Sequence, residues 1–229
     1  MLNKILFIFE GKRPEKQISD SIQRHILQHE SNIVVECVFD AEIYQLYNKI
    51  KDDEFFDTFE LVKQRAPKDL DGYSRKDFAE IYLFFDYDGH ATIADDNTIM
   101  QMLQIFDNET EQGKLYISYP MSEALRHIAD SFKDLSVPCK TNIHYKNIVP
   151  ANCHKEYIDI KKYNLDTKMN YIAFDEFEFL QQIVEQGYIF SKQLEKYINP
   201  KFEVSVLSAF PIFIYDYFGN IKTRKIISI

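Results

Sequence analysis

The sequence predicts an α/β fold, in which helices flank a mostly parallel sheet and a mainly helical C-terminal part follows. One observation behind this is that apolar, strand-like runs alternate with segments whose apolar residues recur at helical spacing, which is the order of βαβ units. Another is that the strand-like runs are continuously apolar, as in strands buried on both faces of a parallel sheet.

The first two strand–helix pairs are the clearest. Residues 4–9 form a continuous apolar strand, and Pro14 suits the first turn of a helix expected over residues 15–29. Residues 32–39 are expected to form the second strand, and residues 41–51 a second amphipathic helix.

A more polar segment, about residues 52–78, is expected to be an insertion before the third strand at residues 80–85. This insertion leaves the exact topology of the sheet open. Three further elements follow in the same alternating order: a helix at residues 99–106, a strand at residues 115–118, and a helix at residues 122–132 with Ser122 as its N-cap.

The alternation stops near residue 149, so residues 1–148 are expected to form the α/β domain and residues 149–229 an extension that packs on it. Residues 174–197 have helical spacing, and the aromatic-rich run at residues 211–218 is expected to be core. Gly219 is expected to stop a helix.

The net charge and the cysteine spacing argue against two classes: proteins that bind nucleic acid tightly on their own, and zinc-binding proteins. The net charge of −9 counts against tight autonomous binding of nucleic acid, though not against an acidic metal site that meets phosphate through cations. Cys37, Cys139 and Cys153 are far apart without zinc-ligand spacing, so reduced thiols are expected. The sequence shows neither a signal peptide nor an apolar run long enough to span a membrane, which favours a cytoplasmic protein.

Acidic residues follow three of the predicted strands. Glu10 follows the first, Asp86 and Asp88 follow the third, and Glu123 comes just after the fourth. The carboxyl ends of parallel strands share one edge, where sites form. Residues two apart in an extended segment point the same way, so Asp86 and Asp88 face one side and Tyr87 turns away.

Such a group of carboxylates fits a divalent metal site. Mg²⁺ prefers oxygen ligands and is typically held by one or two carboxylates plus substrate phosphates. Without a cation, clustered carboxylates would repel one another. An isolated Asp-x-Asp is most often a solvated turn, so the hypothesis depends on the combination with Glu10 in βαβ order.

Two segments resemble known signatures. "FIFEGKRPEKQI" and "LFFDYDGH" look like the two motifs of the Toprim fold, a Rossmann-like domain of topoisomerases, bacterial primases, the ribonuclease that matures 5S rRNA, and OLD family nucleases. "YISYPMSEALRHI" resembles a segment of the OLD-type and RloB/AbiL-like Toprim branch. The resemblance covers about residues 4–132 and implies that Glu10, Asp86 and Asp88 are catalytic. The metal ligands it implies are Glu10, Asp86, Asp88, Glu15 and Glu123.

The chemistry that this resemblance implies is hydrolysis of phosphodiester bonds in DNA or in structured RNA such as tRNA, with Mg²⁺ or Mn²⁺. The topoisomerase and primase activities are less favoured. A topoisomerase needs a tyrosine nucleophile on a separate domain, and a primase normally brings a zinc-binding module, which the cysteine spacing argues against. Glu10 would help to hold a second metal or act as general base. The candidates for contacts to substrate phosphate are Lys12, Arg13, Lys16 and His90.

The partners implied by the resemblance belong to bacterial defence against phage, where small Toprim nucleases often work with an ABC-type ATPase. The chain has no Gly-x-x-x-x-Gly-Lys-Ser/Thr loop, so it does not itself hydrolyse nucleotide by a P-loop. Whether it forms a homo-oligomer stays open. One alternative is a non-catalytic scaffold or sensor subunit, in which the acidic residues have no role in catalysis or metal binding. A phosphatase-like enzyme with an aspartyl nucleophile ranks last, because its aspartates would follow the first strand.

Overall fold

The computed structural model describes residues 4–11, 14–27, 32–51, 57–87, 96–128, 134–140, 145–147, 163, 165–173 and 185–226. The chain divides into two compact units. Unit 1 comprises Met1–Phe85 and Ile93–Leu115, and unit 2 comprises Asp86–Thr92 and Tyr116–Ile229. The predicted boundary near residue 148 stays a prediction, since residues 148–150 lie outside the described ranges.

The fold class is confirmed: the protein has an α/β, Rossmann-like architecture with a mostly parallel five-stranded sheet, in the order β2-β1-β3-β5-β4. β1 pairs in parallel with both β2 and β3, while the short edge strand β4 pairs antiparallel with β5. The bounds of the strands are β1 Lys4–Phe9, β2 Ile33–Val38, β3 Phe78–Asp86, β4 Asp107–Asn108 and β5 Gly113–Ser118.

The central strand β1 is buried on both faces, as its continuous apolar sequence predicts. Ile5, Leu6, Phe7 and Ile8 are 0% exposed. The Phe7 ring packs edge-on against Phe84 of β3 at a centroid distance of 5.3 Å. Burial of each such side chain contributes roughly 2 kcal/mol, so this strand anchors the core of unit 1.

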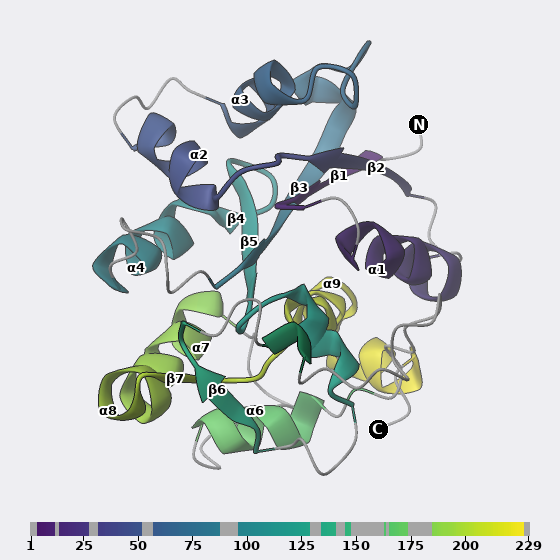
Figure 1. Ribbon diagram of the computed structural model, residues 1–229. Helices are drawn as coiled ribbons and strands as arrows, with labels where there is room; N and C mark the ends of the chain where they lie inside the picture. The colour runs from purple at the N-terminus through teal and green to yellow at the C-terminus, as the bar shows by residue number, and fades with distance from the viewer. Residues whose placement is uncertain are drawn as a thin grey trace. The chain divides into compact units, whose positions relative to one another are not determined.

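Helices cover the sheet of unit 1 on both sides. Figure 1 shows α1 on one side of the sheet and α2 and α4 on the other. The Tyr47 hydroxyl of α2 donates a hydrogen bond to Gln101 Oε1 of α4 at 2.6 Å, which ties these two helices together. The helices are α1 Pro14–Ile22, continued by the π-helical η1 Gln23–Leu27, then α2 Ile43–Ile50, α3 Thr58–Arg65 and α4 Asp96–Ile105.

Unit 2 is mainly helical, which confirms the prediction for the C-terminal part. β6 (Ser136–Pro138) and β7 (Glu203–Ser205) form a small antiparallel pair. The helical elements are the 3₁₀ helix η3 Ser122–Arg126, then α6 Leu165–Ala173, α7 Gln186–Gln193, η7 Leu194–Ile198, α8 Asn199–Lys201 and α9 Ala209–Ile226. Of the helix predicted over residues 174–197, residues 174–184 lie outside the described ranges, and Glu185 is extended before α7 begins.

The first part of the aromatic-rich run is core, as the sequence predicts, whereas Tyr217 and Phe218 at its end are only partly buried. Phe210, Ile212, Phe213 and Ile214 of α9 are at most 1% exposed. The expected stop at Gly219 is a kink: its φ of 69° and ψ of 168° interrupt the helix, which then resumes to Ile226. A glycine adopts this left-handed backbone without the steric cost that a side chain would add.

The expectation of reduced thiols can be compared with the structure at two of the three cysteines. Cys37 is fully buried and Cys139 is partly exposed; both are free thiols, and Cys153 lies outside the described residues. Burial, helped by the charge of Asp69, raises the pKa of the Cys37 thiol to about 12.

Across the described ranges, no helix combines the length and apolarity needed to cross a bilayer.

We expect Gly113→Ala to lower the free energy of unfolding by about 3 kcal/mol, through overpacking and a left-handed backbone. A Cβ at Gly113 would lie 2.6 Å from Leu83 Cδ1 and 3.0 Å from Ile81 Cγ2, and φ is +100°. The measurement is urea unfolding followed by circular dichroism.

The matched control is Gly72→Ala. Gly72 has a φ of +73°, but no atom of the described residues lies within 4 Å of the Cβ that it would gain. This control therefore isolates the backbone cost, which we expect to be about 1 kcal/mol. Equal losses in the two variants would contradict the close packing of β5 on β3.

Lys168 of α6 gives a pH-dependent prediction. This side chain is 3% exposed, and burial lowers its pKa from 10.5 to about 8, against a smaller raising effect of the Asp134 charge. Between these two values the unfolded chain binds more protons than the folded chain, so the contribution of Lys168 to stability rises with pH and is most unfavourable below pH 8. We expect Lys168→Met to stabilise the protein at pH 7 by up to about 3 kcal/mol.

The stabilisation by Lys168→Met should shrink as the pH rises from 8 toward 10, as measured by urea unfolding at half-unit pH steps. Lys140→Met, at an exposed lysine of the same unit, is the control and should show no such trend. A constant difference between Lys168→Met and wild type over this pH range would overturn the prediction.

Candidate functional site

Glu10 lies where three parallel strands end together. Its backbone N–H donates to the Phe84 carbonyl of β3 at 3.2 Å, and its carbonyl accepts from the Asp40 N–H, just after β2, at 3.1 Å. The side chain of Glu10 is half-buried. The sequence expectation that these strand ends share an edge therefore holds for β1, β2 and β3 within unit 1.

Glu15 turns back toward the loop that follows Glu10. It is 5% exposed, although it lies in the first turn of α1. Both of its carboxylate oxygens lie 3.5 Å from the position that a Cβ on Gly11 would take. A carboxylate near a helix N-terminus is favourable because the aligned peptide dipoles are positive there. Lys16, the next residue, is exposed.

Asp86 ends β3 and makes a hydrogen bond within unit 2. Its Oδ1 accepts from the backbone N–H of Ser122 at 2.8 Å. The prediction that Ser122 is an N-cap is wrong: Met121 has that position and an extended backbone, and Ser122 is the first residue of η3. The carboxylate of Asp86 satisfies an N–H at the start of η3, in place of a capping side chain of the helix itself.

The helix after this turn is also shorter than predicted. η3 is a 3₁₀ helix that ends at Arg126, and residues 127–128 are not helical. His127 closes it with a φ of −86° and a ψ of 71°, and its N–H donates to the Ala124 carbonyl in the tight pattern of a 3₁₀ turn. Single 3₁₀ turns rarely extend further. Residues 129–132 of the predicted helix lie outside the described residues.

Glu123 lies on the other side of Ser122 from Asp86. It is 8% exposed, and its Oε2 accepts from the Ser122 hydroxyl at 3.3 Å. Its Oε1 lies 3.5 Å from Nζ of Lys146, whose side chain is 57% exposed. Two acids that the sequence places after different strands therefore meet around one serine.

A buried hydrogen bond lies close to these acids. The Tyr145 hydroxyl and His127 Nδ1 are 2.7 Å apart, and both side chains are 0% exposed. Burial raises the pKa of Tyr145, and the charges of Glu123 and Asp86 are among the further causes that raise it. Tyr145 therefore keeps its proton and can donate it in the hydrogen bond to His127.

Tyr87 is turned into the core of unit 2, as the alternation of an extended segment predicts. It is 6% exposed, and its ring lies 5.6 Å from that of Tyr119 and 6.4 Å from that of Phe190. Four of the predicted site residues lie outside the described ranges: Asp88, His90, Lys12 and Arg13. The structure therefore places Glu10, Glu15 and Lys16 in unit 1 and brings Asp86 and Glu123 together in unit 2.

Neither motif nor spacing assigns a role to three neighbours of these acids, His127, Tyr145 and Lys146, although His127 lies within the segment YISYPMSEALRHI. Tyr145 and Lys146 are separated from η3 by residues without any recognisable spacing. A contact between side chains so distant in the chain arises from tertiary packing, which local patterns do not encode.

The oxygen ligands available around Ser122 suit a hard cation. Asp86 and Glu123 provide carboxylate oxygens, and one or two carboxylates are what Mg²⁺ typically takes from a protein. Within the ranges that the structure covers, no cluster of three or more His, Cys, Asp or Glu residues is placed to hold a metal ion. Asp88, the expected partner of Asp86, is not among those residues.

The fold and these acids together define a Rossmann-like α/β protein with carboxylates at its strand ends. No protein-family model matches the chain, and neither curated proteins nor solved structures gave a match. A function for this chain is therefore inferred from its sequence motifs and from the geometry of these acids.

We expect Tyr145→Phe to lower the free energy of unfolding by about 1–3 kcal/mol, because it removes the hydroxyl that faces His127 Nδ1 in a buried site. The measurement is urea unfolding. Tyr73→Phe is the control, since the Tyr73 hydroxyl makes no hydrogen bond with any described residue. An equally small effect of both substitutions would show that the buried bond contributes nothing to stability.

Proposed function

We propose that this protein is a Mg²⁺-dependent nuclease of the Toprim kind, which hydrolyses phosphodiester bonds of DNA or of structured RNA such as tRNA. The observation that supports this proposal most directly is the pair of acids around Ser122. Asp86 Oδ1 accepts from the Ser122 N–H, and Glu123 follows Ser122 in the chain. The Toprim-like motifs single out the same two residues as metal ligands.

The proposed metal ligands are the carboxylates of Asp86 and Glu123 together with Asp88. When bound, Mg²⁺ would neutralise charge on the phosphate oxygens and orient the reacting group. The backbone N–H of Ser122 holds the Asp86 carboxylate in one orientation, which prepares it for such a role.

Glu10 is the proposed general base, or a ligand of a second metal, with Glu15 in support. Its backbone is fixed on both sides by hydrogen bonds to strand ends, so its position is well defined within unit 1. A half-buried carboxylate that stays in contact with solvent can take a proton from an attacking water.

Substrate phosphates need positive charge in a chain whose net charge is −9. The proposed contacts are Lys12, Arg13, Lys16 and His90. Lys146 adds a candidate that the sequence did not suggest, because its ammonium group lies 3.5 Å from Glu123 and its side chain is 57% exposed.

The proposed biological role comes from the same resemblance. The nuclease would be the effector of an anti-phage defence system and would be controlled by a separate ABC-type ATPase. A chain without a P-loop would depend on such a partner for nucleotide hydrolysis of the P-loop kind. The protein alone is then expected to be weakly active.

The second candidate function is a non-catalytic scaffold or sensor subunit. One observation favours it: Asp86 caps the start of η3, and Glu123 is paired with Lys146, so both acids already have structural roles. In that case, neutralising either acid would change stability without changing any cleavage.

The test compares wild type with Asp86→Asn and Glu123→Gln. Each protein is expressed in bacteria, and the ends of cellular DNA and RNA are sequenced. The purified full chain is also assayed on plasmid DNA and tRNA with Mg²⁺, Mn²⁺ or EDTA. For wild type without its partner we expect weak, metal-dependent cleavage and a correspondingly small number of new ends. For each variant we expect a loss of about 100-fold or more in cleavage, the size typical of removing an essential acid–base or metal-binding group.

The matched control is Asp107→Asn, at an exposed aspartate of β4. It makes the same change of charge away from the proposed site and should cleave like wild type. Unchanged cleavage by Asp86→Asn, or the absence of Mg²⁺ and Mn²⁺ binding by the wild-type protein, would exclude the nuclease and favour the scaffold.

A further inference from the structure

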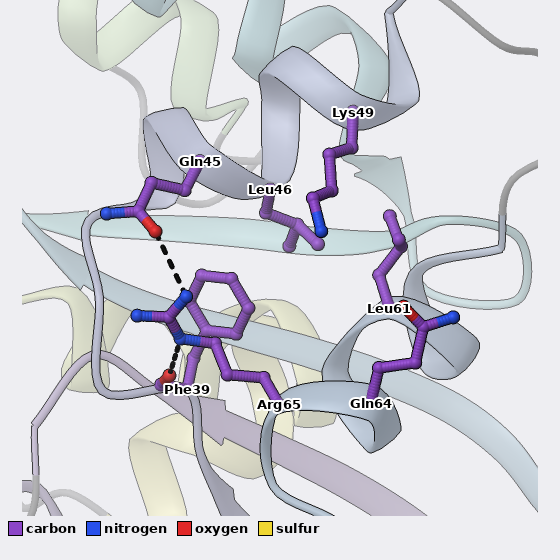
Figure 2. A pocket seen from close by; sticks show the side chains of 7 residues that line it. All are labelled: Phe39, Gln45, Leu46, Lys49, Leu61, Gln64 and Arg65. Carbon is purple, nitrogen blue, oxygen red and sulfur yellow. Dashed lines mark hydrogen bonds between the residues drawn. The ribbon is translucent and has the colours of Figure 1, made fainter.

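A pocket of about 300 Å³ lies between α2 and α3 of unit 1 and is separate from the acids described above. Figure 2 shows α2 side chains along one wall and α3 side chains along the other. The lining residues are Phe39, Gln45, Leu46, Lys49, Leu61, Gln64 and Arg65.

The shape of the pocket is explained by helical spacing. Gln45, Leu46 and Lys49 lie on one face of α2, because residues three and four apart in a helix are neighbours on its surface. Residues 61, 64 and 65 of α3 do the same on the facing helix. Leu46 is 0% exposed and Leu61 is 4% exposed, so the floor is apolar and the longer polar side chains form the rim.

Arg65 gives the pocket a positive charge that no described carboxylate neutralises. Its Nε, Nη1 and Nη2 donate to the Phe39 carbonyl at 2.8 Å, to Gln45 Oε1 at 3.0 Å and to the Asp40 carbonyl at 3.2 Å. All three acceptors are uncharged. The guanidinium also stacks over the Phe39 ring at 5.0 Å from its centroid, which holds it rigidly. These bonds use three of the five N–H donors of an arginine.

Lys49 supplies the second positive charge. It is exposed, and it forms no hydrogen bond or ion pair with any residue that the structure describes. Figure 2 shows its ammonium group directed toward the space between Leu46 and Leu61 rather than away from the pocket. Among the described residues that line the pocket none is acidic, although the chain as a whole is acidic.

We propose that this pocket binds a small organic anion, with an apolar or planar body on the leucine floor and a carboxylate or phosphate group between Lys49 and Arg65. Its volume lies at the lower end of ligand sites, which suits a mononucleotide or a smaller molecule. The amides of Gln45 and Gln64 offer both donors and acceptors to polar edges of such a body.

The pocket lies next to the end of β1. Phe39 N–H donates to the Phe9 carbonyl at 2.8 Å, and Asp40 N–H donates to the Glu10 carbonyl at 3.1 Å. Arg65 holds the carbonyls of the same two residues, Phe39 and Asp40, from the pocket side. The ligand site is therefore separated from Glu10 by a single pair of strand-end residues. Binding here does not require that the protein is a nuclease.

The test is isothermal titration of the full chain with AMP, adenosine, benzoate and inorganic phosphate. We expect AMP or benzoate to bind at one site, with an affinity about tenfold lower in Lys49→Met and in Gln64→Glu, because each loses or opposes an interaction of about 1.4 kcal/mol with the anion. Adenosine, which has a similar body but no charge, should bind more weakly than AMP and be insensitive to Lys49→Met.

Two control variants make the same changes elsewhere in unit 1. Lys76→Met and Gln104→Glu alter exposed residues that do not line the pocket, and both should bind like wild type. Failure of both organic anions to bind, equal binding by Lys49→Met, or binding of inorganic phosphate as tight as that of AMP would overturn the proposal. None of these results depends on cleavage of nucleic acid, so the nuclease proposal stands or falls separately.

Discussion

β1 is hydrogen-bonded in parallel to β2 on one side and β3 on the other, and the rest of unit 1 depends on this arrangement. A strand in this position has both faces in the core, so every residue from Ile5 to Phe9 is apolar and buried. Its parallel neighbours require crossover connections, and the helices of those connections cover the two faces. The buried strand ends at Phe9, and the backbone of Glu10, the next residue, is hydrogen-bonded to Phe84 and Asp40 at the ends of the two neighbouring strands.

The strands and most of the helices could be predicted from the sequence because their signals are local. Continuous apolar runs mark β1, β2 and β3, and helical periodicity marks α1 and α2. The hydrogen bond at the start of η3, from the Ser122 N–H to Asp86, could not be predicted, because these two residues come from distant parts of the chain. Strand β4 has two residues, too few for any periodicity to appear.

For the candidate site, the sequence could identify acids but not what surrounds them. Asp86 and Glu123 are visible as polar residues after apolar strands, and parallel topology predicts that they approach one another. Their contacts with Ser122 and Lys146 could not be predicted: the sequence predicts Ser122 as the cap of its own helix, and the position of Lys146 in the chain says nothing about its contacts. Asp86 accepts the Ser122 backbone N–H, whereas Glu123 accepts the Ser122 hydroxyl and lies 3.5 Å from the Lys146 ammonium group. These contacts arise from tertiary packing and are compatible with either a metal site or a purely structural turn.

Gly113 begins β5, and a Cβ at this position would lie 2.6 Å from Leu83 Cδ1 and 3.0 Å from Ile81 Cγ2 of β3, closer than packed atoms approach. A chain that keeps these two strands at this separation, with side chains of the same size on β3, favours glycine at the corresponding place. The preference is steric, so it does not depend on similarity in the rest of the sequence. A glycine that opens the strand before a Tyr-Pro-Met-Ser-Glu-like turn is therefore a physical criterion for recognising distant relatives that whole-chain comparison does not find.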